Sequence, residues 1–202
     1  YHGLEFDATG ACVKVPGQTR IPPGAQVRSF PVVERWGLVW IWTGDAATAD
    51  AALLPDWWWL DSAHWKTIPG RGGKPMPVAA NYLLISDNLF DITHLGYVHA
   101  TSIGNDAIVD FPAKTERSGR SVKMTRLVNM PTPETETSTH YFYAHARHFK
   151  VDDPAWDDIY RSQFTAVFEE DQIILNAQQA RMSAMPDAPH IDVNSDAPNI
   201  QV

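Results

Sequence analysis

The stretch DNLFDITHLGYVH, residues 87–99, carries three acid or amide side chains and two histidines among mostly apolar neighbours: Asp87, Asn88, Asp91, His94 and His99. A solvated helix face would be richer in Lys and Glu, and a core helix would not carry this polar load. The two histidines are five residues apart, whereas side chains that meet on one helix face are three or four apart. Gly96 lies between them and would permit a bulge or a helix end. The stretch therefore predicts a helix over residues 81–99 with a candidate metal site, and two imidazoles suit zinc, iron, copper or nickel.

A second helix, predicted over residues 154–182, supplies a carboxylate in an unusual place. Apolar residues recur at helical spacing along it: Phe164, Val167, Phe168, Ile174 and Leu175. Asp171 lies in the middle of this stripe, while Glu169 and Glu170 are expected to point toward solvent. A lone carboxylate in a buried stripe is costly unless it is paired or coordinated. Asp171 is therefore a candidate third ligand.

These residues can be read in two ways. His94, His99 and Asp171 together make a two-histidine, one-carboxylate triad, which on Fe(II) leaves positions open for oxygen and substrate. Separately, two such histidines are often structural, and Asp171 could pair instead with Arg147 or Arg181. The joint pattern favours the metal site. Three further histidines on a predicted strand are interpreted as surface or pocket-wall residues: His140, His145 and His148.

Composition limits the class of protein. The 202 residues are 44% hydrophobic and 20% charged, as in globular proteins, and eight Trp and fifteen Pro indicate a strand- and loop-rich chain. No apolar run approaches the roughly 20 residues of a membrane span, and no signal peptide is visible after Tyr1. The net charge of −8 argues against nucleic-acid binding. Cys12 is the only cysteine, which excludes an intrachain disulfide and favours a reducing, cytoplasmic setting.

The order of the predicted elements indicates an α+β chain with two domains. Residues 1–45 have the Val, Trp and turn pattern of strands. Residues 45–80 are proline-rich and are expected to form a connector. Residues 119–130 and 138–149 alternate polar and apolar positions with the period of strands. Strands followed by two long helices predict a second domain over residues 46–202.

Several segments of the sequence resemble those of a known family. Residues 88–99 resemble the mononuclear-iron motif of Rieske non-heme iron oxygenases, in the branch with the vanillate O-demethylase oxygenase component and dicamba monooxygenase. The end of the family's Rieske domain is resembled by Tyr1-His2-Gly3-Leu4, with Gly10 and Pro16-Gly17-Gln18 after it. The helix with the third iron ligand is resembled by Phe168-Glu169-Glu170-Asp171, followed by Gln178-Gln179. The start of the family's final segment is resembled by residues 194–202.

The resemblance implies a role for each residue of the motif. His94, His99 and Asp171 would bind the mononuclear Fe(II). Asp91 would be the bridging carboxylate between His94 and a cluster histidine of a neighbouring subunit, where it would orient the imidazole and offer a short path for electrons. Asn88 would lie beside the iron, near the substrate pocket.

The resemblance also implies a second cofactor and an incomplete chain. His2 would be the second histidine ligand of a Rieske [2Fe–2S] cluster, which takes two Cys and two His, but Cys12 matches no ligand position. Only His2 of the cluster ligands is therefore expected here. The implied fold is the C-terminal end of a β-rich Rieske domain followed by a helix-grip catalytic domain. Compared with the family, strands after Met130 and the final helix after Val202 are expected to be missing.

The implied activity is O2-dependent O-demethylation of a methoxylated aromatic acid such as vanillate. An NAD(P)H-dependent reductase or a ferredoxin would supply electrons to the cluster, and the assembly would be a homotrimer. The alternatives are hydroxylation of an aromatic ring or an aryl methyl group at the same iron, a non-catalytic helix-grip module that binds a ligand, and a zinc hydrolase. In the binding module, His94 and Asp171 would be a buried hydrogen-bonded pair.

Overall fold

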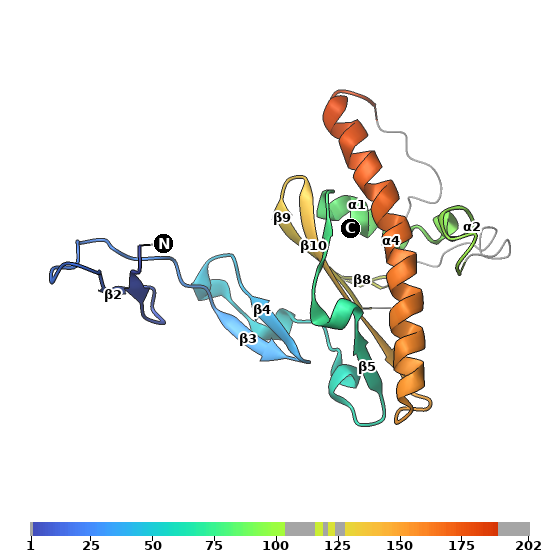
Figure 1. The fold of residues 1–202 in the computed structure, drawn as a ribbon, viewed down its shortest axis with the longest axis horizontal. Coiled ribbons are helices and arrows are strands. Elements are labelled where there is room, and N and C mark those ends of the chain that lie inside the picture. Colours follow the sequence, from blue (N-terminus) through green and yellow to red (C-terminus); the bar gives the residue numbers. More distant parts are fainter. Residues whose placement is uncertain (1, 104–115, 119–120, 124–127, 190–202) are drawn as a thin grey trace. The chain divides into compact units, whose positions relative to one another are not determined.

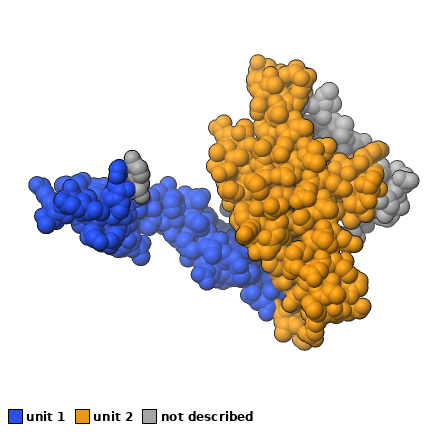
Figure 2. Space-filling model, viewed as in Figure 1, with its two compact units in different colours: residues 1–61 blue, residues 62–202 orange. Residues whose placement is uncertain are grey.

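The computed structural model describes residues 2–103, 116–118, 121–123 and 128–189. The chain divides into two compact units, residues 1–61 and 62–202, which Figure 2 distinguishes by colour. The expected boundary at residue 45 lies within the first unit, and the assignment of residues 1–45 to a Rieske domain stays a prediction. None of the described helices is both long and apolar enough to cross a membrane.

The first unit contains two short antiparallel hairpins. Strand β1 (Glu5–Phe6) pairs with β2 (Cys12–Lys14), and β3 (Val32–Arg35) pairs with β4 (Leu38–Ile41). Gly10 adopts a φ of +85° between β1 and β2, the left-handed conformation that glycine tolerates at a tight turn. The two hairpins confirm the strand and turn pattern predicted for residues 1–45.

Tryptophans hold the second hairpin to the segment that follows it. The ring centroid of Trp57 lies 6.1 Å from that of Trp36 and 5.5 Å from that of Trp40. Such aromatic pairs bury large apolar area with a preferred tilt. The short 3₁₀ helices of the chain are η1 (Ala46–Thr48), η2 (Ala51–Leu53), η3 (Trp58–Asp61), η4 (Gly70–Gly73) and η5 (Ile92–His94).

The second unit is built on a four-stranded antiparallel sheet (Figure 1). Its central strand β10 (Ser138–Arg147) pairs with β9 (Val128–Thr135) along one edge, and with β6 (Met76–Val78) and β5 (Lys66–Pro69) along the other. Two strands of the sheet thus come from the segment expected to be a connector, which is a correction. A separate pair joins β7 (Glu116–Ser118) to β8 (Ser121–Lys123).

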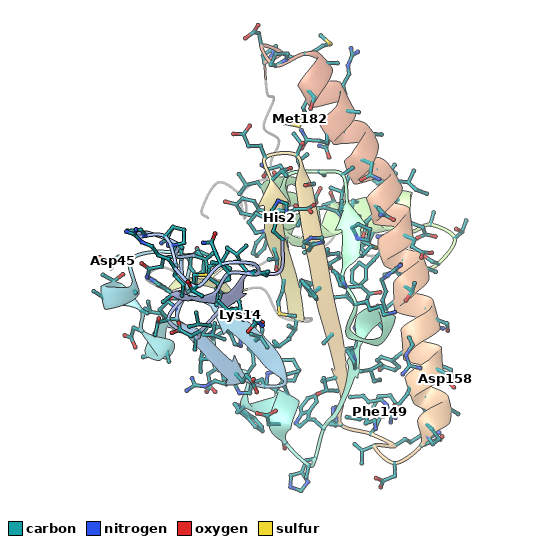
Figure 3. All side chains as sticks on the ribbon, turned by 60° about the vertical axis from the view of Figure 1, so that its left-hand side comes forward. His2, Lys14, Asp45, Phe149, Asp158 and Met182 are labelled. Carbon is teal, nitrogen blue, oxygen red and sulfur yellow. The ribbon has the colours of Figure 1, made fainter. Side chains whose placement is uncertain are left out.

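The long helix α4 (Pro154–Ala184) packs against this sheet (Figure 1). It begins as the sequence predicts: Asp153 accepts a hydrogen bond from Ala155 N at 3.1 Å, and Pro154 occupies the first turn. Figure 3 marks the two ends of the helix at Asp158 and Met182. The apolar core between sheet and helices comprises Met76, Val78, Ala80, Leu84, Ile85, Tyr141, Tyr143, Phe168 and Leu175. Antiparallel sheet and packed helices confirm the α+β class.

Side-chain amides of α4 fasten it to the chain just after β6. Asn176 Oδ1 accepts from Ala79 N and Gln179 Oε1 accepts from Asn81 N, each at 2.8 Å. Gln172 Nε2 donates to the carbonyl oxygen of Pro77. Because the helix α1 (Tyr82–Phe90) starts directly after this segment, these bonds place the start of α1 against α4.

A buried arginine closes the connection from β10 to α4. The Arg147 side chain is fully buried and donates to the carbonyl oxygens of Phe149 at 2.8 Å and Asp153 at 2.9 Å. It also donates to the carbonyl oxygen of Lys150 and to the carboxylate of Asp157. One guanidinium therefore donates to three backbone carbonyl oxygens of the connection, and its charge is paired with a carboxylate.

His145 on β10 is buried and is not the surface or pocket-wall residue expected from the sequence. Its ring stacks on Phe164 with centroids 3.7 Å apart, and neither ring nitrogen has a hydrogen-bond partner among the described residues. Burial lowers the pKa of His145 from 6.5 to about 4. The ring therefore stays neutral in the folded protein under mildly acidic conditions.

We expect His145 to make the protein sensitive to acid. Between pH 6.5 and pH 4 the unfolded chain binds a proton at His145 and the folded chain does not. The stability that His145 contributes is therefore fully present above pH 6.5 and is lost as the pH falls toward 4. Between pH 7.5 and pH 5 the loss from this residue is about 2 kcal/mol. H145F keeps a ring but cannot titrate, so its urea midpoint should fall less over this interval than that of the wild type. Equal losses in both proteins would refute this assignment.

Candidate metal centre

The chain around the opening motif is not one helix but three short pieces. α1 ends at Phe90, and Asp91 leaves the helical conformation with φ −86° and ψ 91°. After η5, the four-residue helix α2 (Leu95–Val98) follows, with His94 and His99 at its two ends. The expectation of a break at Gly96 is wrong, because Gly96 lies inside α2. The histidines converge because they flank a single helical turn.

Asp91 stabilises the break in the helix. Its Oδ1 accepts hydrogen bonds from Thr93 N at 2.9 Å and from Thr93 Oγ1 at 2.6 Å. This local side-chain-to-backbone bonding competes with helix continuation. The Asp91 backbone carbonyl contacts His94 Nδ1. Asp91 therefore touches His94 through its backbone, while its carboxylate is engaged by Thr93; the predicted bridging role of that carboxylate stays a prediction.

The structure brings His94, His99 and Asp171 together. His99 Nε2 lies 3.2 Å from His94 Nε2 and 3.0 Å from Asp171 Oδ1, and His94 Nε2 lies 3.5 Å from the same oxygen. These are residues of two segments more than seventy positions apart in the chain. His99 is 1% exposed and Asp171 5%. The three donor atoms thus meet at one nearly buried point.

The separations of the three donor atoms suit coordination to a metal ion, and the atoms do not satisfy one another by hydrogen bonds. Neighbouring ligands at right angles on an ion with bonds of about 2.1 Å lie about 3.0 Å apart, close to the separations of these atoms. Asp171 Oδ1 is buried and, despite its short distances to the two rings, no described residue donates an aligned hydrogen bond to it. An unsatisfied buried carboxylate oxygen is expensive, and coordination would satisfy it. Two imidazoles and one carboxylate make a donor set suited to Fe(II).

The far side of the His99 ring meets a second carboxylate. His99 Nδ1 lies 2.7 Å from Glu170 Oε2, which also accepts from Ser102 Oγ at 2.8 Å. The expectation that Glu170 points to solvent is wrong. Burial lowers the pKa of His99, but the neighbouring carboxylates of Asp171 and Glu170 outweigh it and raise the pKa above its ordinary value. The bonds from His99 and Ser102 lower the pKa of Glu170.

The remaining predicted residues lie as follows. Asn88 Nδ2 is 3.5 Å from His94 Nε2, so the amide lies beside the three donors. His2 is exposed in the first unit, where φ is +60°, and its role as a cluster ligand stays a prediction. Cys12 is buried in β2, and its Sγ lies 3.4 Å from the carbonyl oxygen of Lys14. Arg147, the suggested alternative partner of Asp171, pairs with Asp157 instead.

Sequence reasoning missed Glu170 and Ser102. The apolar stripe of α4 places Asp171 on the buried face, and Glu170 starts about 100° away around the helix axis. A glutamate side chain is long enough to reach back to the same imidazole. A serine three residues after His99 gives no signal of its own, since its role depends on where α4 lies.

Comparisons with known proteins identify the family. The family model of the vanillate O-demethylase oxygenase C-terminal domain matches residues 78–130 and 127–202. The iron-sulfur subunit of the toluene-4-sulfonate monooxygenase system of Comamonas testosteroni is 33% identical over 98% of this chain and 74% of that protein. The chain belongs to the vanillate O-demethylase oxygenase family. It is therefore a Rieske non-heme iron oxygenase, as the sequence motif predicts.

Two further members support the assignment. The oxygenase component of dicamba O-demethylase from Stenotrophomonas maltophilia is 33% identical over 90% of this chain and 69% of its own length. The crystal structure of dicamba monooxygenase bound to dicamba superimposes with a TM-score of 0.82 at 30% identity, covering the whole chain and 75% of that structure. The fold of a Rieske oxygenase catalytic domain is thereby confirmed.

The alignments also bear on the expected missing strands. The match to the Comamonas subunit extends over 261 positions, whereas this chain has 202 residues. That relative therefore has residues without a counterpart here. The two pieces matched by the family model meet at residues 127–130. The expected absence of strands after Met130 stays a prediction.

Proposed function

We propose that this chain is the oxygenase component of a Rieske non-heme iron monooxygenase that O-demethylates a methoxylated aromatic acid. The observation that carries the proposal is the convergence of His94, His99 and Asp171 at one buried point, with an Asp171 oxygen that lacks a hydrogen bond. Dicamba O-demethylase, a family member, is named for removal of a methyl group from oxygen. The motif and the relatives thus support the same reaction class.

The residues of the site would act as follows. His94 and His99 would bind Fe(II) through Nε2, and Asp171 through Oδ1. When bound, Fe(II) supplies a redox centre with open positions for O2. The Asp91 carbonyl accepts from His94 Nδ1, which holds the proton on that nitrogen and leaves the Nε2 lone pair free for the metal.

The overall reaction balances with two electrons from outside the site. A methoxy arene, O2, two electrons and two protons would give a hemiacetal and water, and the hemiacetal would release formaldehyde to leave a phenol. An NAD(P)H-dependent reductase or a ferredoxin would supply the electrons through a Rieske [2Fe–2S] cluster, with His2 among its ligands. Asp91 would link this cluster to His94 across a subunit boundary in a homotrimer. We place this system in the cytoplasm.

A second candidate function is hydroxylation of an aryl methyl group. It is favoured by the similarity to a toluene-4-sulfonate monooxygenase subunit. The triad suits either reaction, because both begin with oxidation of a C–H bond on a small group attached to the ring. The products differ, since hydroxylation of an aryl methyl group yields a stable alcohol and releases no formaldehyde.

The test is a product assay with matched substrates. The protein is supplied with a reductase, NADH and O2, and is offered methoxybenzoates and the corresponding methylbenzoates. The proposal predicts one formaldehyde and one phenol per O2 consumed from a methoxybenzoate. Turnover of the methylbenzoates alone would favour the second candidate. Ester cleavage without O2 would indicate a zinc hydrolase, and binding without turnover a ligand-binding module; either would contradict the proposal.

A further inference from the structure

Two neighbouring carboxylates of α4 contact the two nitrogens of one imidazole. Asp171 Oδ1 lies 3.0 Å from His99 Nε2, and Glu170 Oε2 lies 2.7 Å from His99 Nδ1. The His99 side chain is 1% exposed, so neither nitrogen can exchange its partner for bulk water. The orientation of the ring is therefore set by α4 at both nitrogens.

We propose that Glu170 is a positioning residue of the metal centre, which fixes the tautomer and the ring plane of His99 so that Nε2 faces the metal. This inference rests on the proposed function of the triad. A hydrogen bond from the second ring nitrogen to a carboxylate makes an imidazole a stronger and better oriented ligand. The resemblance described above assigns Glu170 no role, since only its neighbour Asp171 is implied to be a ligand.

Ser102 holds Glu170 in the position that this role requires. The Glu170 side chain is 30% exposed, so without a second partner it could rotate away into solvent. Ser102 Oγ donates to the same Oε2 at 2.8 Å, and it also lies 3.4 Å from the carbonyl oxygen of His99. A three-residue chain therefore runs from Ser102 through Glu170 to His99 and joins α4 to the turn after α2.

The two histidines of the site are supported differently. His94 Nδ1 contacts the neutral backbone carbonyl of Asp91, whereas His99 Nδ1 meets a carboxylate. Loss of the Glu170 carboxylate should therefore weaken only the His99 side of the site and leave two ligands held as before. The expected effect is a weaker metal site, not an absent one.

Glu169 provides a matched control. It is the adjacent residue on α4 and has the same side chain, but it is 52% exposed and lies 3.5 Å from Arg71. A pair this exposed contributes little to stability. E169A changes the charge of α4 by the same amount as E170A without touching His99.

The experiment measures metal affinity directly. The protein is freed of mononuclear iron with a chelator, and Co2+ or anaerobic Fe2+ is titrated in by calorimetry. We expect E170A to bind about 10- to 100-fold more weakly than the wild type. E170Q retains an acceptor oxygen of the same length and should recover part of this loss, and S102A should lose less than E170A. Affinity of E170A equal to that of E169A would overturn the proposal.

A second readout separates positioning from folding and from the triad itself. A merely structural Glu170 would lower the melting temperature of the metal-free protein and leave metal affinity unchanged, so affinity is measured well below that temperature. E170Q, nearly the same in shape, answers the question if E170A fails to fold. Activity of E170A should recover in excess Fe(II), with the KM for the aromatic substrate unchanged. If H99A binds metal as tightly as the wild type, the proposed function fails. If H99A loses metal affinity but E170A binds as tightly as the wild type, this inference alone fails.

Discussion

Replacing Asp171 with alanine is expected to abolish mononuclear-iron binding and turnover without unfolding the protein. Asp171 would be the anionic ligand of the triad, and two neutral imidazoles alone would leave Fe(II) weakly held. In the metal-free protein its Oδ1 is buried without a hydrogen bond, which costs about 1–3 kcal/mol. Metal-free D171A should therefore be no less stable than the metal-free wild type. A residue kept at a cost to stability is one that function requires.

Iron content per chain and thermal unfolding of the metal-free protein check this expectation. D158A is the control, since Asp158 lies on the same helix (Figure 3), is 79% exposed and pairs with Arg161 of that helix at 2.7 Å. It should keep full iron and turnover. The triad assignment would be wrong if D171A retained iron, and the cost assigned to the buried oxygen would be wrong if metal-free D171A melted well below the wild type.

Replacing Arg147 with methionine should cause the largest loss of stability. The substitution leaves Asp157 with only its more exposed pair to Lys66, at 3.6 Å. It also removes the only donor to the carbonyl oxygen of Phe149 among the described hydrogen bonds, and one of two donors to the carbonyl oxygens of Lys150 and Asp153. Breaking a buried ion pair from one side costs about 3–5 kcal/mol. R147K keeps the charge but lacks the planar fork that reaches several acceptors, so it should recover only part of the loss.

Urea unfolding at neutral pH measures the effect of R147M. R161A is the control, because Arg161 is exposed and its pair with Asp158 is expected to contribute at most about 1 kcal/mol. Folded R147M should still bind iron, since Asp157 and Asp171 are about 20 Å apart along α4. A midpoint shift of R147M no larger than that of R161A would show that the buried network adds nothing to stability.

The parts of the fold that the sequence predicts best are those with a long, regular pattern. α4 begins with an Asp153 cap and a proline, as predicted, and it ends at Ala184, two residues beyond the predicted end. One expected member of its buried stripe, Ile174, is 51% exposed. β10 alternates over ten residues. The strands β5 and β6 could not be recognised, because each is only three or four residues long and contains a proline. Their strand conformation depends on β10, which supplies their hydrogen-bond partners.

Within the candidate site, the sequence predicted which residues are proposed ligands, but it did not predict the local backbone geometry that brings them together. The two histidines and Asp171 were found from residue type and burial pattern, and the structure brings them together. The position of the helix break was missed, because glycine merely permits a break, while the hydrogen bonds of Asp91 to Thr93 favour one. Glu170 was missed because a helical stripe describes where a side chain starts and not how far it reaches.

The hydrogen bonds between the side-chain amides of α4 and the backbone around the end of β6 bear on how the proposed metal centre responds to salt and pH. Gln172, Asn176 and Gln179 carry no charge, so neither ionic strength nor protonation changes their bonds to the backbone. The start of α1 is thus held against α4 by groups that salt and acid leave untouched. Changes of medium should therefore act on the charged contacts around the proposed ligands, such as that of Glu170 with His99, while the start of α1 keeps its distance from α4.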